Sequence, residues 1–173
     1  NNTRAYPFYT SLAATGLYSS ANDLAKFVSM QLPENFRSAQ SRSLLSKTSL
    51  KEMRMPQASE MGLDIWGLGT MLFASNNDYD FIIGHGGLSP SLNSTVRLNP
   101  KNGNAFILLE TGNRFLAADS ATKWTLWETG NPDMYLLKNM IPPMLLRVLV
   151  GCILIFITSL VIVWRKRRVN QSV

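Results

Sequence analysis

A β-hairpin is predicted by the stretch Ser94-Thr95-Val96-Arg97-Leu98-Asn99-Pro100-Lys101-Asn102-Gly103-Asn104-Ala105-Phe106-Ile107-Leu108-Leu109. In its first part Val96 and Leu98 alternate with Arg97, which is typical of a strand with one buried face. Its middle part contains the Asn-Gly pair that tight hairpin turns favour. From position 105 to 109 every residue is apolar, which predicts a strand buried on both faces.

Two further strands are predicted upstream of this hairpin. Residues 66–73 are rich in glycine and apolar side chains, and residues 79–84 form a second run. Between them Ser75-Asn76-Asn77-Asp78 has the composition of a turn. The sequence therefore predicts four antiparallel strands that follow one another along the chain.

Two short helices are predicted before these strands. Ser20-Ala21-Asn22-Asp23 is a capping-box start, and apolar residues follow it at helical spacing until Pro33. Ser49-Leu50-Lys51-Glu52 is a second capping box, which opens a helix that stops before Pro56.

A third helix is predicted over residues 115–128, after the strands. Leu116, Trp124 and Trp127 lie toward one side of it, and Gly130-Asn131-Pro132 ends it. The expected fold class is therefore α+β, with an antiparallel sheet and flanking helices.

A membrane-spanning helix is predicted near the C-terminus. Residues 148–164 carry no charge, and adding residues 144–147 gives 21 positions. At about 1.5 Å per residue this helix is roughly 30 Å long, the thickness of a bilayer hydrocarbon core. A buried core helix is the alternative, but a core helix of this length usually has a polar face.

The net charge of +6 is concentrated at the same end. Residues 144–173 have five basic residues and no acidic one, whereas residues 1–143 have 12 basic and 11 acidic residues. The near-neutral body offers no basic face for phosphates, so we expect no nucleic-acid partner. Arg165-Lys166-Arg167-Arg168 should stay in the cytoplasm, which places the body outside it and makes the lipid bilayer a partner.

Four segments are therefore expected: a body (1–133), a juxtamembrane linker (134–143), a transmembrane helix (144–164) and a basic cytoplasmic tail (165–173). Pro142-Pro143 predicts a stiff break in the linker. The body has no export signal of its own in these residues, so we expect the chain to be the C-terminal part of a longer protein.

One cysteine and one histidine exclude a disulfide framework and a zinc finger, and we expect no metal and no cofactor.

The most unusual stretch is Gly84-His85-Gly86-Gly87-Leu88, which contains the chain's only histidine at the end of a predicted strand. Glycine permits close approach of a ligand or another backbone. Free N–H groups beside an imidazole can stabilise an oxyanion and shuttle a proton. The alternative is a lone histidine in a glycine turn.

Six landmarks between residues 10 and 133 resemble the serine β-lactamase-like family, which includes class C β-lactamases, low-molecular-weight penicillin-binding proteins and related esterases. The order and spacing of these landmarks carry the resemblance, because no single motif is specific. They are Thr15-Gly16-Leu17 with Asp23-Leu24-Ala25, Leu44-Leu45-Ser46 with residues 50–53, Trp66-Gly67-Leu68-Gly69, Gly84-His85-Gly86-Gly87, Asn99-Pro100 with Thr111-Gly112-Asn113, and the Trp-rich helix with Gly130-Asn131-Pro132.

The resemblance implies roles for four residues. His85 would take the place of the family's motif Lys or His, contacting the substrate carboxylate or joining the proton network. Gly86 would line the substrate site, Gly87 would keep the strand open, and the backbone N–H of Leu88 would be one oxyanion donor. The implied reaction is amide or ester hydrolysis through an acyl-serine, with β-lactams, D-Ala peptides or esters as substrates.

The family's nucleophile motif, Ser-x-x-Lys, is absent upstream of His85, and so is Tyr-x-Asn. Ser20-Ala21-Asn22 and Ser75-Asn76-Asn77 match Ser-x-Asn, but they fall in a helix cap and a turn. The one Ser-x-x-Lys, Ser120-Ala121-Thr122-Lys123, follows His85 and lies on the closing helix, where an exposed helix start is the simpler interpretation. We therefore expect no nucleophile in this chain.

Two functions remain open. The first is part of a membrane-anchored serine hydrolase, inactive without the missing segment. The second is a non-catalytic, membrane-tethered binding or sensor relative of penicillin-binding proteins. A structural protein whose glycine motif is only a turn is a third class, and the six landmarks argue against it.

Overall fold

The computed structural model describes residues 17–36, 44–76, 80–89 and 92–170. They form a six-stranded antiparallel sheet in which every strand lies beside its neighbour in sequence. The strands are β1 Ala58–Glu60, β2 Leu63–Trp66, β3 Met71–Asn76, β4 Asp80–Leu88, β5 Asn93–Leu98 and β6 Ala105–Glu110. The helices are α2 Ala21–Ser29, the 3-10 helix η1 Glu34–Phe36, α3 Lys47–Arg54, α4 Leu116–Thr129 and α5 Met134–Asn170.

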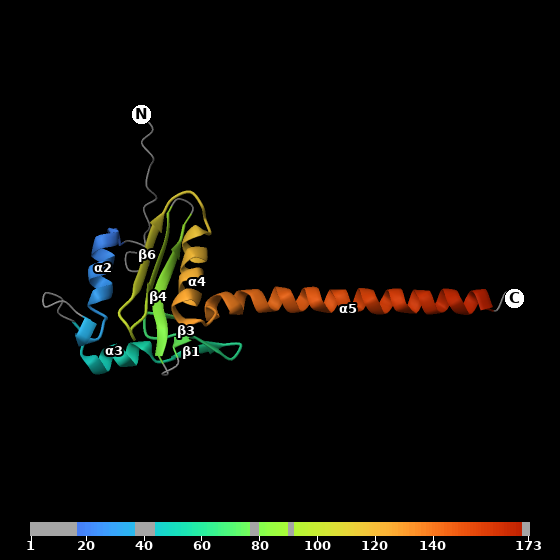
Figure 1. Cartoon of the computed structure of the whole chain (residues 1–173), viewed down its shortest axis with the longest axis horizontal. Coiled ribbons are helices and arrows are strands. Elements are labelled where there is room, and N and C mark those ends of the chain that lie inside the picture. Colours follow the sequence, from blue (N-terminus) through green and yellow to red (C-terminus); the bar gives the residue numbers. More distant parts are fainter. Residues whose placement is uncertain (1–16, 37–43, 77–79, 90–91, 171–173) are drawn as a thin grey trace, which may run out of the picture.

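The molecule has three layers, with α2 on one face of the sheet, α4 on the other and α5 leaving the body (Figure 1). On the α2 face, Val28 and Leu32 pack against Leu72, Ile83 and Leu98. On the α4 face, the core consists of Met71, Phe73, Ala74 and Ile82, with Trp66 and Trp124 packed against it. The predicted α+β class, with an antiparallel sheet and flanking helices, is confirmed.

The predicted strand over residues 66–73 is wrong, because a turn divides it into β2 and β3. Gly69 has a φ of +66°, a left-handed conformation that glycine adopts without steric cost. A side chain at Gly67 would overlap with the carbonyl oxygen of Met53, so α3 packs directly against this turn. The short strand β1 was not predicted, because its three exposed residues carry no apolar pattern.

The strand predicted over residues 79–84 is longer in the structure. As β4 it continues through His85, Gly86 and Gly87 to Leu88, because β5 pairs with it along the whole segment from Ile83 to Leu88. Position 79 and the centre of the predicted turn before it (77–78) lie outside the described residues.

The apolar strand β6 is at the edge of the sheet rather than buried on both faces. Its residues after Ala105 are all half-buried, because β5 is the only strand that pairs with it among the described residues. Ile107 packs on the α2 side, while the ring of Phe106 stacks on Trp124 of α4 at 6.0 Å between centroids. The preceding turn is as predicted, since the Gly103 N–H donates to the Asn99 carbonyl at 2.9 Å.

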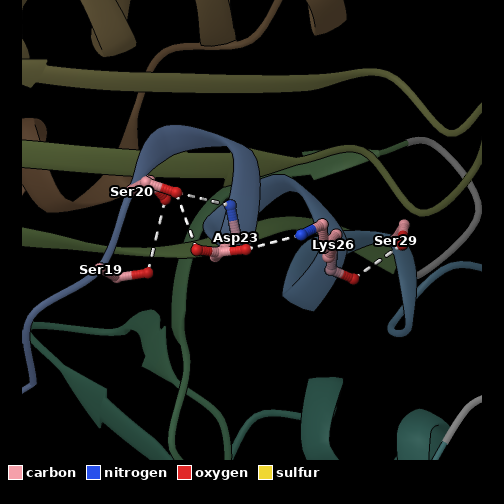
Figure 2. Close-up of polar contacts among 5 residues, drawn as sticks. All are labelled: Ser19, Ser20, Asp23, Lys26 and Ser29. Atoms are coloured by element: carbon pink, nitrogen blue, oxygen red, sulfur yellow. Dashed lines mark hydrogen bonds and ion pairs between the residues drawn. The ribbon is translucent and has the colours of Figure 1, made fainter.

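The predicted cap of α2 is confirmed (Figure 2). The Ser20 hydroxyl accepts from the Asp23 N–H at 3.2 Å and donates to the Asp23 carboxylate at 2.9 Å. For α3 the predicted start is wrong by one turn: the N-cap is Ser46, whose hydroxyl accepts from the Ser49 N–H at 3.1 Å. Only Ser49 has a Glu three residues later, but serine is a favoured N-cap residue without it, and with Ser46 as the cap Leu50 lies in the helix and is buried.

Helix α4 meets the sheet through small side chains. Ala117, Ala121 and Thr125 repeat every four residues and are buried. Trp124 also packs inward, as predicted, but Leu116 and Trp127 are 44% and 76% exposed. The predicted inner face of α4 was chosen from its large apolar residues. A helix that packs closely on a sheet instead buries the side with small residues, here Ala117, Ala121 and Thr125.

Helix α5 is continuous from Met134 to Asn170 and contains Pro142 and Pro143. The expected break at these prolines is therefore wrong. Each proline lacks a backbone N–H, so two intrahelical hydrogen bonds are missing at this point although the helix continues through it. Residues Met140–Arg167 contain an 18-residue window with a mean hydropathy of 2.7, and the segment is long and apolar enough to cross a membrane.

The packing of α4 predicts the effect of enlarging Ala121. Because this side chain is completely buried against the sheet, Ala121→Leu should lower the free energy of unfolding by about 1–3 kcal/mol. Ala25→Leu makes the same change at an exposed position of α2 and should cost less than about 0.5 kcal/mol. Denaturant unfolding of the full chain in detergent, followed by tryptophan fluorescence, measures both, and equal stability of the two variants would contradict the packing described.

Candidate functional site

The candidate site is a free strand edge at the end of β4. Pairing between β3 and β4 ends at Met71 and Gly84, where β3 begins. Beyond that point His85–Leu88 pairs with β5 alone. One side of this four-residue segment is therefore open in the described part of the chain.

Thr70 shows which backbone groups point toward the open side. Its hydroxyl accepts from the Gly84 N–H at 3.1 Å and lies 3.2 Å from the Gly84 carbonyl oxygen. Both polar groups of Gly84 therefore point away from β5. Because this direction alternates along an antiparallel strand, the N–H and C=O of Gly86 and Leu88 also point to the open edge.

His85 lies at this edge and is exposed. Its Nδ1 is 2.8 Å from the carbonyl oxygen of Gly86. A carbonyl can only accept, so Nδ1 carries the proton in this hydrogen bond and Nε2 of the neutral ring has a free lone pair. The ring lies 5.9 Å from that of Trp66, at a tilt of 54°. The imidazole can therefore accept a proton at Nε2 from a group placed at the edge.

The two glycines after His85 differ in their surroundings. A Cβ at Gly87 would lie 2.6 Å from the Ser94 hydroxyl, so a side chain there would displace Ser94 on β5. A Cβ at Gly86 would meet nothing closer than the Ser94 carbonyl oxygen at 3.8 Å. Gly86 is thus free of steric constraint from the protein and leaves space for another molecule.

A cavity of about 540 Å³ lies beside this edge, between the sheet, α4 and the start of α5. His85, Gly86, Gly87 and Leu88 line it, so the structure brings all four predicted residues together at one cavity wall. The remaining walls are mostly apolar and include Trp66, Met71, Phe73, Phe115, Ala117, Ala118 and Leu136. Such a cavity suits a small molecule with an apolar body.

A buried ion pair forms the floor of the cavity. Arg97 and Asp133 are 5% and 2% exposed, and their charged groups are 3.6 Å apart. The Arg97 guanidinium also lies 3.2 Å from the centroid of the Phe73 ring and donates to the Thr95 hydroxyl at 2.8 Å. Burial lowers the pKa of Arg97 to about 10, and the Asp133 carboxylate opposes that shift. Arg97 remains charged at neutral pH.

Asp133 also connects the sheet to α5. One of its carboxylate oxygens accepts from the Leu136 N–H at 3.2 Å and caps the first turn of the helix. Arg97 lies on the face opposite Val96 and Leu98, as the alternation predicts, but the sequence pattern did not indicate that Asp133 is its partner. An arginine on the inward face of a strand is the signal that a buried acid must lie nearby.

Ser120 and Lys123 do not form a nucleophile pair. The Lys123 ammonium lies 2.7 Å from the Asp119 carboxylate, on the exposed side of α4. Ser120 is half-buried and is not among the cavity-lining residues of the described chain. Within the same residues, no three His, Cys, Asp or Glu side chains are close enough to hold a metal ion.

The family model for β-lactamase matches residues 1–130. Because the match covers more than half of the 173 residues, the chain belongs to the β-lactamase family. No curated protein and no solved structure matches the chain.

The buried ion pair predicts an asymmetry between two aspartates. Asp133→Asn would leave the Arg97 charge without its partner and should lower the free energy of unfolding by about 3–5 kcal/mol. Asp119→Asn breaks the exposed pair with Lys123 and should cost about 0.5 kcal/mol or less. Chemical unfolding of the full chain measures both, and similar losses would show that the buried pair contributes no more than a surface pair.

Proposed function

We propose that this chain supplies the His-x-Gly wall of an acyl-transfer cleft in a membrane-anchored serine hydrolase of the class C β-lactamase type. The chain would be the C-terminal portion of that enzyme, with the serine nucleophile outside these 173 residues and no activity of its own. The observation that carries the proposal is the free edge of β4, where His85 and the backbone of Leu88 face one cavity.

Each residue of the edge has a proposed role. The N–H of Leu88 is one oxyanion donor, since its direction along the strand matches that of the Gly84 N–H. His85 holds or receives a proton at Nε2, and its ring can also contact a substrate carboxylate. Gly86 leaves room for the substrate beside the strand, and Gly87 keeps the strand against Ser94.

The proposed reaction has two steps. The serine hydroxyl attacks the carbonyl carbon of an amide or ester, and the negative charge develops on the carbonyl oxygen near the Leu88 N–H. The leaving group takes a proton and departs, which leaves an acyl-serine. Water then attacks the ester and releases the acid and the free serine. Substrates of this class are β-lactams, peptides ending in D-Ala-D-Ala and small esters.

The anchor in this proposal is α5. Residues 144–164 would cross the bilayer, residues 165–173 would lie in the cytoplasm and residues 1–133 outside it, with residues 134–143 at the outer surface. The hydropathy of the span within α5 supports a crossing. The four consecutive basic residues after Trp164 support this orientation.

Labelling with a fluorescent penicillin tests the catalytic part. The 173-residue chain should not be labelled, because its one Ser-x-x-Lys lies outside the cavity. The product of the complete gene should be labelled at an upstream serine. Covalent labelling of the 173-residue chain at Ser120 would overturn the assignment.

His85→Gln in that complete protein should slow acylation by about 10²–10⁴-fold, because glutamine cannot exchange a proton. Gln57→Ala, at an exposed position before β1, is the control and should label at the wild-type rate. An upstream segment that lacks the serine, together with reversible binding of penicillin, would favour the non-catalytic binding or sensor relative.

A further inference from the structure

The outer face of α4 presents large apolar side chains that no other described residue covers. Opposite the buried stripe of small residues, Leu116, Leu126 and Trp127 are 44%, 50% and 76% exposed. Between them lies the exposed ion pair of Asp119 and Lys123. Scattered apolar residues are ordinary on a protein surface, but a 76% exposed tryptophan on the same outer side of one helix as two exposed leucines makes this side a candidate contact surface.

This face is directed along α5. In Figure 1, α4 lies on the side of the sheet from which α5 leaves, and its axis runs across the direction of α5. Only residues 130–133 connect the two helices. Because Asp133 both caps α5 and pairs with the buried Arg97, this junction is held against the sheet rather than on a loose linker.

The distance between α4 and the apolar part of α5 fits a membrane surface. The candidate span defined by hydropathy begins at Met140, four residues before the span of 144–164 proposed above, and the distance from the start of α5 to Met140 is six residues. At about 1.5 Å per residue this is roughly 9 Å along the helix axis. The headgroup layer on each side of the hydrocarbon core is about 5–8 Å thick. An α5 that spans the bilayer therefore brings the outer face of α4 to the level of the headgroups.

We propose that α4 lies flat on the bilayer and that Leu116, Leu126 and Trp127 insert into the headgroup interface. This inference rests on the proposed anchoring by α5. Tryptophan is enriched at this depth because its ring is apolar and its indole N–H is polar. The Asp119–Lys123 pair can stay hydrated among the headgroups. Contact through α4 would hold the edge of β4 at a constant height above the membrane.

Spin labels on the full chain in phosphatidylcholine–phosphatidylglycerol liposomes test this placement. In a Cys152→Ser background, single cysteines are introduced by Lys123→Cys on α4, Phe156→Cys in α5 and Phe27→Cys on α2. Phe27 is 58% exposed and belongs to the helix on the opposite face of the sheet, so it is the matched control. The readout is the collision rate of each label with a water-soluble nickel chelate.

The expected result is a collision rate at position 123 several-fold lower than at position 27, with position 156 lowest. Adding Leu126→Ser and Trp127→Ser should raise the rate at position 123 toward that at position 27. If position 156 is shielded but position 123 is as accessible as position 27, α4 does not contact the membrane although the anchor holds. If position 156 is accessible, the anchoring itself fails and this inference fails with it. Shielding at position 27 would also overturn it, because the contact would not be specific to α4.

Discussion

Gly84 is the point on which the candidate site depends. Its φ of +154° and the overlap that a Cβ would make with the Val96 carbonyl oxygen exclude other residues there. On one side its N–H and C=O meet the buried Thr70 hydroxyl, and on the other it pairs with Arg97. The Thr70 hydroxyl bonds to the Gly84 backbone groups that would otherwise pair with β3. The pairing between β3 and β4 therefore ends at Gly84. The four residues that follow therefore have β5 as their single neighbouring strand in the part of the chain that the structure describes.

The same place is also linked to the candidate membrane helix. Arg97, paired with Gly84 across the strands, holds Asp133, and Asp133 caps α5. Burying two charges costs free energy, and the pair recovers this cost only while both partners are present. The position of α5 is thus tied to the strand that carries His85. A hydrolase built in this way would work at a constant orientation to its membrane.

Local sequence patterns predicted most of the helices and strands. The predictions were wrong where tertiary packing determines a helix boundary or the buried face of a helix. The alternation of Val96 and Leu98 and the Asn-Gly turn gave the hairpin, because both depend on neighbouring residues only. The capping-box pattern placed the start of α3 at Ser49, whereas the N-cap in the structure is Ser46, one turn earlier, and Leu50 is buried. Apolar residues of α4 suggested an inner face with Leu116, Trp124 and Trp127, but in the structure Trp124 packs inward beside the buried Ala117, Ala121 and Thr125, whereas Leu116 and Trp127 are exposed.

For the candidate site, the motif Gly84-His85-Gly86-Gly87 drew attention to the chain's only histidine, and the resemblance to the β-lactamase-like family implied the roles of His85, Gly86, Gly87 and Leu88. Only the tertiary structure decided that these residues form an open edge, since that depends on where β3 begins. It also decided that the partner of Arg97 is Asp133, which lies 36 positions along the chain. The sequence by itself determined the α+β class and the long apolar helix, because those follow from periodicity and length. The open edge of β4 and the pairing of Arg97 with Asp133 depend on residues far apart in the sequence. They follow from how the layers pack.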